Sequence, residues 1–219
     1  MARQIPSKGR YPLGVLAFAF APLPAAEASV RARDLDFEFF DPAVGTDPST
    51  LALPVGCPSS DPNPVPGWGF SPAPRDGPGR WEATAERFRA APGCLMEPWA
   101  GSCVNSLETM RAMAEEVPGL RFLVDTGHVA AWGGDPVELL EYADHVQLRQ
   151  GKPGHGQVHI DDPAGTVDFA AVIRRLDAIG YQGKLAVEYF SLPELGWPLE
   201  DPVGWAVDLA AYVRPLLEK

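Results

Sequence analysis

The sequence predicts an α/β fold built from parallel βα units, arranged as a barrel or a sheet, and two observations support this. Short apolar runs alternate with segments of ten or more residues that have helical patterning, as expected for strands joined by crossover helices. Four of the apolar runs also deliver a polar side chain at their carboxyl ends, namely Glu97, Asp125, Gln147 and Glu188. Because parallel strands end on one shared face, we expect these four side chains to converge.

In the second half of the chain, expected strands alternate regularly with expected helices. Strands are expected at residues 94–97, 121–125, 143–148 and 184–190. Helices are expected at residues 81–90, from 105 to about 118, from 135, at 168–179, and from 201 to about 215. Asn105 to Glu108 resembles a capping box, and Asp135-Pro136 supplies a cap followed by a proline at the first helical position. Gly180 is placed to end its helix.

The first eighty residues are less regular. Residues 13–20 and 35–40 predict early strands, the second ending near Asp41, and residues 51–57 could form another. Prolines and glycines then crowd the segment at about 54–80, and no long helix survives that density. Residues 1–53 are too few for a separate α/β domain, so we expect one domain over residues 1–219 with an irregular proline-rich segment.

The N-terminus allows a second interpretation. Three basic residues precede the apolar run at 13–21, and Ala26-Glu-Ala28 resembles a cleavage site, which together are passable as a secretory signal. We favour the strand and a cytoplasmic location. Three scattered cysteines fit a reduced chain better than a disulfide framework. No apolar run is long enough to span a membrane.

The amino-acid composition limits the classes of partner that we expect this protein to bind. The chain has 219 residues and a net charge of -11, from 18 basic and 29 acidic residues. Non-specific nucleic-acid binding depends on lysine and arginine neutralising phosphates, so this balance argues against it. An excess of carboxylates is compatible with a cation site. We therefore expect a small-molecule partner and neither nucleic acid nor membrane.

The four strand-end side chains suggest a metal and a reaction. Oxygen ligands suit Mn²⁺ or Mg²⁺, and an added imidazole would admit Zn²⁺ or Co²⁺. A divalent ion disperses the charge of an enediolate, which forms when a proton leaves the carbon beside a carbonyl. One carboxylate can take that proton and a second can return it. The expected chemistry is therefore proton transfer on a small hydroxy-carbonyl compound.

From about Gly93 to Phe190 the chain resembles the xylose-isomerase-like TIM barrels, a superfamily of sugar phosphate isomerases and epimerases, hydroxypyruvate isomerase, inosose dehydratases and endonuclease IV. The resemblance rests on the order and spacing of several short motifs, each weak alone. They are Leu95-Met-Glu-Pro98, Val124-Asp-Thr-Gly-His128 followed by Gly133-Gly-Asp-Pro136, Asp144-His-Val-Gln-Leu148, Gly165-Thr-Val-Asp-Phe169, and Gly180 to Glu188. It implies a (β/α)8 barrel with a shortened, proline-rich N-terminal half, and leaves the completeness of the barrel open.

The resemblance also implies roles. Glu97, Asp125 and Glu188 match metal-binding acids, and Gln147 stands where many members place a histidine and those resembling hydroxypyruvate isomerase place glutamine. His128 matches a residue that contacts substrate or binds a second metal. Glu97 and Glu188 match the acid and base that act on opposite faces of a sugar.

Further residues are candidates for substrate contact, each with a plainer alternative. His145 shares the strand side of Gln147 and could instead be packed. Arg149, Lys152 and His155 belong to a segment expected over the site, yet could be solvated. Glu38 matches a family acid. Trp68, Phe70 and Trp132 could line a sugar pocket or pack the loops.

Several function classes follow. We favour a metal-dependent isomerase or epimerase of a small sugar or hydroxy-carbonyl compound, for which the resemblance implies a homodimer. The Asp125 to His128 motif also resembles the inosose dehydratases, which share the enolate step and then expel a hydroxyl. An endonuclease IV-like nuclease is disfavoured, because the chain has four histidines, none before residue 128. A non-catalytic barrel that serves as a binding module is the remaining alternative.

Overall fold

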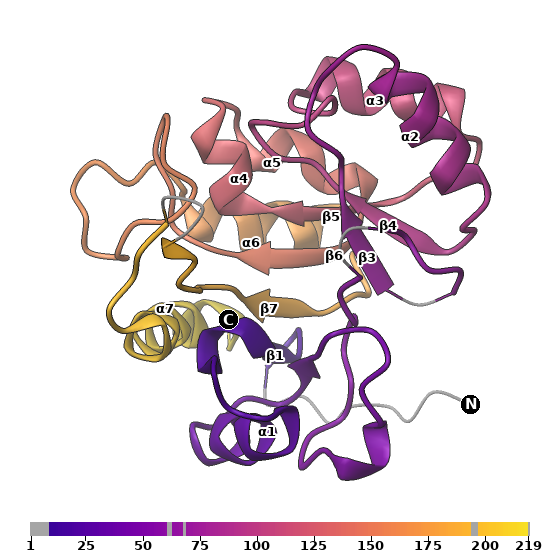
Figure 1. The fold of residues 1–219 in the computed structure, drawn as a ribbon. Coiled ribbons are helices and arrows are strands. Elements are labelled where there is room, and N and C mark those ends of the chain that lie inside the picture. Colours follow the sequence, from indigo (N-terminus) through magenta and orange to yellow (C-terminus); the bar gives the residue numbers. More distant parts are fainter. Residues whose placement is uncertain (1–8, 61–62, 68, 194–196, 219) are drawn as a thin grey trace.

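A computed structural model describes residues 9–60, 63–67, 69–193 and 197–218. Seven strands form one curled parallel sheet in the order β2-β1-β7-β6-β5-β4-β3 (Figure 1). The strands are β1 (Leu13–Leu16), β2 (Phe40–Asp41), β3 (Gly69–Pro72), β4 (Cys94–Glu97), β5 (Phe122–Asp125), β6 (Ala143–Leu148) and β7 (Leu185–Val187). The expected α/β fold is thereby confirmed, as an incomplete TIM barrel.

An irregular segment at residues 54–60 spans the gap between the two edge strands. Val55 forms a parallel bridge with Phe40 of β2, and Ser59 forms one with Phe70 of β3. The amide of Gly56 donates to the carbonyl of Phe40 at 2.9 Å, and the amide of Phe70 donates to the carbonyl of Pro58, also at 2.9 Å. Backbone hydrogen bonds therefore continue around the barrel, although the segment at residues 54–60 is not a regular strand.

The helical layer is dense over the C-terminal half and thin over the N-terminal half. Its α-helices are α1 (Ala25–Asp34), α2 (Arg80–Arg89), α3 (Leu107–Glu116), α4 (Thr126–Ala131), α5 (Pro136–Leu139), α6 (Phe169–Ala178) and α7 (Pro202–Leu217). The 3₁₀ helices are η1 (Ala17–Phe20), η2 (Pro48–Thr50) and η3 (Leu140–Tyr142). Between β2 and β3, the only helix in the described part of the chain is the short η2. The barrel is therefore incomplete chiefly because it lacks longer helices covering the side between β2 and β3.

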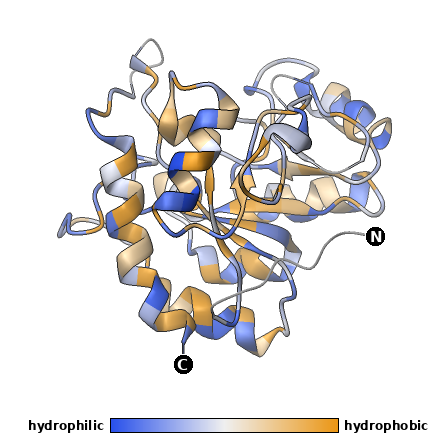
Figure 2. Ribbon diagram, turned by 90° about the horizontal axis from the view of Figure 1, so that it is seen from below, coloured by the Kyte–Doolittle hydropathy of each residue, from blue (hydrophilic) through white to orange (hydrophobic). Residues whose placement is uncertain are grey.

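The core follows the strands and the inner faces of the helices. Figure 2 shows hydrophobic residues gathered along the strands and hydrophilic residues on the outer helices and loops. On α6, Phe169, Val172, Ile173 and Leu176 are buried, which is the apolar face that the sequence predicts. Within the described residues, no helix is long and apolar enough to cross a membrane.

Most expected elements of the second half are present. The strands at 94–97 and 143–148 have the expected bounds, and Asp135, Asp168 and Asp201 cap their helices through side-chain hydrogen bonds. One cap differs: Ser106, rather than Asn105, caps α3 and forms the capping box with Thr109 instead of Glu108. Asn105 with Glu108 and Ser106 with Thr109 each place a polar residue three positions before a side chain that can form hydrogen bonds. Spacing alone therefore does not show which pair forms the capping box.

The first half departs further from expectation. The strand expected at 13–20 ends at Leu16 and continues as η1, and the strand expected at 35–40 is reduced to Phe40–Asp41. Residues 25–34 form α1 and residues 126–131 form α4, and neither segment is among the helices that the sequence predicts. The last helix continues through Pro215 to Leu217, two residues beyond its expected end.

Candidate active site

Four buried polar side chains lie at the carboxyl ends of neighbouring strands. Glu97 ends β4, Asp125 ends β5, Gln147 pairs in register with Asp125 on β6, and Glu188 directly follows β7. Their exposed fractions are 4%, 1%, 0% and 4%, respectively. The strands β4, β5, β6 and β7 are consecutive neighbours in the sheet, so these four strand ends lie side by side.

His128 joins two of these acids in a compact group. Its Nε2 lies 3.5 Å from Oε1 of Glu97 and 3.9 Å from Oδ2 of Asp125. One ligand atom from each of the three residues lies within 4.8 Å of the others, so together they could hold a metal ion. Two indole rings lie near the imidazole, with centroid distances of 6.5 Å to Trp99 and 6.0 Å to Trp197.

Local structure explains how His128 reaches this position. Asp125 caps α4, because its Oδ1 accepts hydrogen bonds from the amides of Gly127 at 2.7 Å and His128 at 3.2 Å. The cap starts the helix directly at the strand end and turns His128 back toward Glu97. Asp125 therefore acts as a helix cap through one oxygen and faces the site with the other.

Arg149 is the cation of this cluster. Its side chain is fully buried, its guanidinium forms an ion pair with Asp125, and its Nη2 lies 3.8 Å from Oε2 of Glu188. The guanidinium carbon lies 5.0 Å from the ring centroid of Phe190. Its backbone is fixed by Thr126, whose hydroxyl donates to the Arg149 carbonyl at 2.8 Å. A buried guanidinium supplies a permanent positive charge between two carboxyl groups.

Burial and this cation separate the pKa values of the two carboxyl groups. For Asp125, burial raises the pKa, but the charge of Arg149 and the proximity of His128 outweigh it, and the pKa falls below its usual value. For Glu188, burial dominates; the charge of Arg149 opposes it, but the charges of Asp125 and Glu97 add to it, so the pKa lies well above its usual range. In the metal-free protein Asp125 is therefore ionised and Glu188 holds its proton more tightly.

The same surroundings keep His128 neutral. Burial lowers its pKa first, the charge of Arg149 lowers it further, and Asp125 opposes both; the resulting pKa is about 3. A neutral imidazole can offer a nitrogen lone pair to a metal ion or to a substrate hydroxyl. For Arg149, burial lowers the pKa, but Asp125, Glu188 and Glu97 more than offset it, so the guanidinium stays charged.

Several buried polar atoms in the site have no hydrogen-bond partner within the described part of the chain. They are both amide atoms of Gln147, Oε2 of Glu188 and Nη1 of Arg149. Leaving such atoms unpaired costs on the order of 1–3 kcal/mol each. Their concentration in one place indicates a site built for an ion, water or ligand that completes these bonds.

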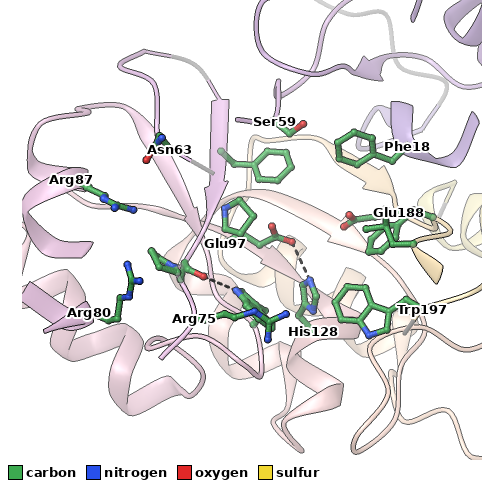
Figure 3. A pocket seen from close by; sticks show the side chains of 17 residues that line it. Phe18, Ser59, Asn63, Arg75, Arg80, Arg87, Glu97, His128, Glu188 and Trp197 are labelled. Carbon is green, nitrogen blue, oxygen red and sulfur yellow. Dashed lines mark hydrogen bonds and ion pairs between the residues drawn. The ribbon is translucent and has the colours of Figure 1, made fainter. Parts of the chain in front are cut away.

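A cavity of about 700 Å³ opens above the cluster (Figure 3). Glu97, His128 and Glu188 line it, and Figure 3 shows Glu97 and Glu188 separated across it. Phe70, a sequence candidate for the pocket wall, also lines it. The volume falls in the range of about 300–1,000 Å³ that is usual for small-molecule sites.

Other sequence candidates lie elsewhere. His145 pairs with Asp41 at 2.7 Å in the barrel interior. Oε2 of Glu38 accepts a hydrogen bond from the amide of Leu13, at the opposite end of β1 from the site. Lys152 forms an ion pair with Asp162 at 2.9 Å.

The remaining three candidates differ in their surroundings. His155 is exposed and lines a second cavity of about 390 Å³ together with Arg149. Trp132 directly follows α4 as its C-cap residue, packs against the core and does not line either cavity. Trp68 lies outside the described residues.

Sequence reasoning missed some residues that the fold brings to the site. Trp99, Trp197 and Arg75 line the cavity from loops, and Asp41 stands opposite His145 inside the barrel. Asp41 carried a signal, because it follows an apolar run as the other strand-end acids do. The loop residues carried none, since loop positions show no periodicity that indicates direction.

Comparisons with known proteins agree with this architecture. The family described as Xylose isomerase-like TIM barrel matches residues 65–215. Comparison with curated protein sequences finds no match.

Solved structures of similar fold include three sugar epimerases. A 3-keto-D-glucoside 4-epimerase from E. coli is 17% identical, with a TM-score of 0.67 over 94% of this chain and 99% of that chain. An L-ribulose 3-epimerase is 16% identical, with a TM-score of 0.67 over 94% of each chain. A D-psicose 3-epimerase from Clostridium cellulolyticum is 13% identical, with a TM-score of 0.70 over 95% of this chain and all of that chain. At these identities the likeness establishes the fold.

Proposed function

The chain belongs to the xylose isomerase-like TIM barrel family, and we propose that it is a divalent-metal-dependent isomerase or epimerase of a small sugar or hydroxy-carbonyl compound. The observation that carries this proposal is the convergence of Glu97 and Glu188 on one cavity, with Asp125, His128 and Arg149 behind them. The sugar epimerases of similar fold support the same reaction class.

The donor set fits a divalent ion. Glu97, Asp125 and His128 already stand within ligand distance of one another. Gln147 and Glu188 contribute buried oxygens that lack partners in the described chain, which suits them to complete a coordination sphere. Two carboxylates with an imidazole accept Mn²⁺, and also Zn²⁺ or Co²⁺, while a set of oxygens alone favours Mg²⁺ or Mn²⁺. When bound, the ion would supply positive charge against the negative charge of an enediolate.

The protein's own groups account for proton movement. One of Glu97 and Glu188 takes a proton from the carbon beside the substrate carbonyl, and the electron pair of the broken C–H bond moves into the enediolate. In epimerisation the other glutamic acid returns a proton to the same carbon from the opposite face, which inverts that carbon. In isomerisation a proton is returned to the neighbouring carbon, and a hydroxyl proton moves from one enediolate oxygen to the other as the new carbonyl forms. His128, held neutral, can hydrogen-bond a substrate hydroxyl, and Trp99 and Trp197 exclude water beside it.

Deuterium exchange tests this function even when the product is unidentified. Metal-free protein is incubated with a panel of ketoses in D₂O, with and without Mn²⁺, and deuterium at the carbon beside the carbonyl is followed by NMR. We expect exchange that depends on Mn²⁺, and we expect Glu97→Gln or Glu188→Gln to slow it about 10²–10⁴-fold, because general acid–base catalysis contributes that much.

The control is Glu115→Gln, which removes an exposed acid of α3. It should leave exchange unchanged, and all three variants should give folded spectra by circular dichroism. Full exchange in both site variants would refute the assignment. Absence of both exchange and any Mn²⁺-dependent rise in melting temperature would favour a non-catalytic binding module.

The dehydratase alternative is distinguished in the same reaction mixture. It is favoured by the sequence Asp125-Thr-Gly-His128 with Gly133-Gly-Asp-Pro136, which resembles that branch. A dehydratase would share the deuterium exchange and would also release water, leaving a product with one hydroxyl fewer. The mass of the product therefore decides between the two reactions.

A further inference from the structure

Three arginines line the cavity, and two of them, Arg80 and Arg87, lie on the side away from Glu188. Arg75, Arg80 and Arg87 line it together with Glu97 and Glu188, and these five are its charged lining residues within the described chain. Figure 3 shows Arg80 and Arg87 on one side of the cavity and Glu188 on the other. Positive charge is thus concentrated on the side of the cavity opposite Glu188. We refer to Arg75, Arg80 and Arg87 as the arginine wall.

The arginine wall lacks the partners that other arginines of this chain have. Nine described arginines each form an ion pair with a carboxylate: Arg10, Arg33, Arg89, Arg111, Arg121, Arg149, Arg174, Arg175 and Arg214. Among the described residues, the arginines without such a partner are Arg31 and the three of the arginine wall. In a chain with 29 acidic residues, three guanidinium groups on one cavity wall with no carboxylate partner in the described chain indicate an anionic occupant.

The arginine wall has a defined arrangement. Arg80 and Arg87 lie seven residues apart on α2, so they project from the same face about two turns, or roughly 10 Å, apart. Arg75 stacks on Trp99, with its guanidinium carbon 5.0 Å from the ring centroid. Because Trp99 also contacts His128, this stacking links the wall to the site.

We propose that the arginine wall binds the phosphate group of a sugar phosphate while its carbonyl end lies between Glu97 and Glu188. This inference rests on the proposed function and specifies its substrate class. Arginine suits phosphate because its planar donors match the oxygens in pairs. The cavity volume of about 700 Å³ leaves room for a sugar and its phosphate between the two ends.

Binding measurements by titration calorimetry test the substrate class. The probes are D-fructose, D-fructose 6-phosphate and D-glucuronate, with the metal-free protein and with the Mn²⁺-loaded protein. We expect the phosphate ester to bind at least about tenfold more tightly than the free ketose, because hydrogen bonds to charged groups contribute that much. Raising the salt concentration should reduce this advantage, since the wall is exposed.

Variants assign the effect to the arginine wall. The double variant Arg80→Gln with Arg87→Gln should lose most of the preference for the phosphate ester, and Arg75→Gln should lose part of it. Arg31→Gln is the matched control, because Arg31 is likewise exposed and without a carboxylate partner in the described chain, but lies on α1 outside the cavity lining. It should bind the phosphate ester as the unaltered protein does. Unchanged melting temperatures show that the variants are folded.

The outcomes separate this inference from the proposed function. Equal affinity for ketose and phosphate ester, or equal losses in Arg31→Gln, would overturn the inference even if deuterium exchange occurs. A preference for D-glucuronate over the phosphate ester would overturn the phosphate assignment in favour of a carboxylate. Phosphate-selective binding that the arginine variants abolish, without deuterium exchange on any probe, would overturn the proposed reaction and leave the anion site in place.

Discussion

At the scale of single residues, one buried cation organises the site. Arg149 pairs with Asp125, lies 3.8 Å from Glu188 and depresses the pKa of His128. The sequence places Arg149 after the Gln147 strand and suggests substrate contact, but it does not indicate complete burial. Burial follows from a contact between distant segments, because the guanidinium enters between β5 and the residue after β7. Its Nη1, which has no partner in the described chain, leaves one donor for a ligand.

His128 predicts a pH dependence of stability. Its pKa is about 3 in the folded protein, with burial as the largest cause, and about 6.5 in the unfolded chain. Between these values the unfolded chain binds a proton that the folded protein does not, so the free energy of unfolding falls as pH decreases below about 6.5. In EDTA, lowering the pH from about 7.5 to about 5 should cost on the order of 2 kcal/mol through this residue.

Urea unfolding at the two pH values measures this contribution. His128→Gln should lose less stability over the interval than the unaltered protein, whatever its stability at neutral pH. His155→Gln, at an exposed loop position, should retain the full pH dependence. The same pH dependence in His128→Gln as in the unaltered protein would show that His128 is not held neutral in the fold.

At the scale of elements, caps and apolar faces decide where helices begin. The aspartates at 135, 168 and 201 each accept an amide hydrogen bond from the first turn of the next helix, as their sequence contexts indicate. The unexpected α4 also begins at an aspartate, Asp125. A helix of six residues spans fewer than two turns, which is too few to show a repeating apolar pattern in the sequence.

The cap of α3 gives a test of element stability. Oγ of Ser106 accepts the amide of Thr109 at 3.1 Å, and Oγ1 of Thr109 accepts the amide of Ser106 at 3.0 Å. Ser106→Ala should lower the free energy of unfolding by about 1 kcal/mol, because the cap is lost. Ser106→Asp should retain most of it. Chemical denaturation measures both, and an equal loss in Asn105→Ala alone would return the cap to the position that the sequence favoured.

At the scale of the whole molecule, the irregular segment at 54–60 closes the barrel. Its hydrogen bonds to β2 and β3 replace those of a regular strand. Phe39 fills the adjacent interior, and its ring lies where side chains on Gly14 or Gly56 would stand. The position of Phe39 therefore requires that residues 14 and 56 have no side chain.

Gly56→Ala tests this closure. A Cβ at Gly56 would lie 2.0 Å from Oδ1 of Asp41 and 2.3 Å from the Phe39 ring, so the segment must shift. We expect a loss of about 1–3 kcal/mol in the free energy of unfolding, and faster amide exchange at Gly56 and Phe70, because overpacking displaces backbone. Gly156→Ala, whose Cβ would meet its nearest neighbour at 3.5 Å, is the control and should change neither measurement.

The sequence by itself determined the βα order of the second half and the strand-end residues Glu97, Asp125, Gln147 and Glu188. Both are local properties, because a strand's period and its polar end are written in consecutive residues. The tertiary structure determined which other residues these side chains contact. It brought His128 to Glu97, Arg149 to Asp125 and the arginine wall to the far end of the cavity, and it joined β2 to β3 through residues 54–60. Each of these contacts joins segments that are far apart in the sequence, and the placement of one such segment relative to another has no periodic pattern in the sequence.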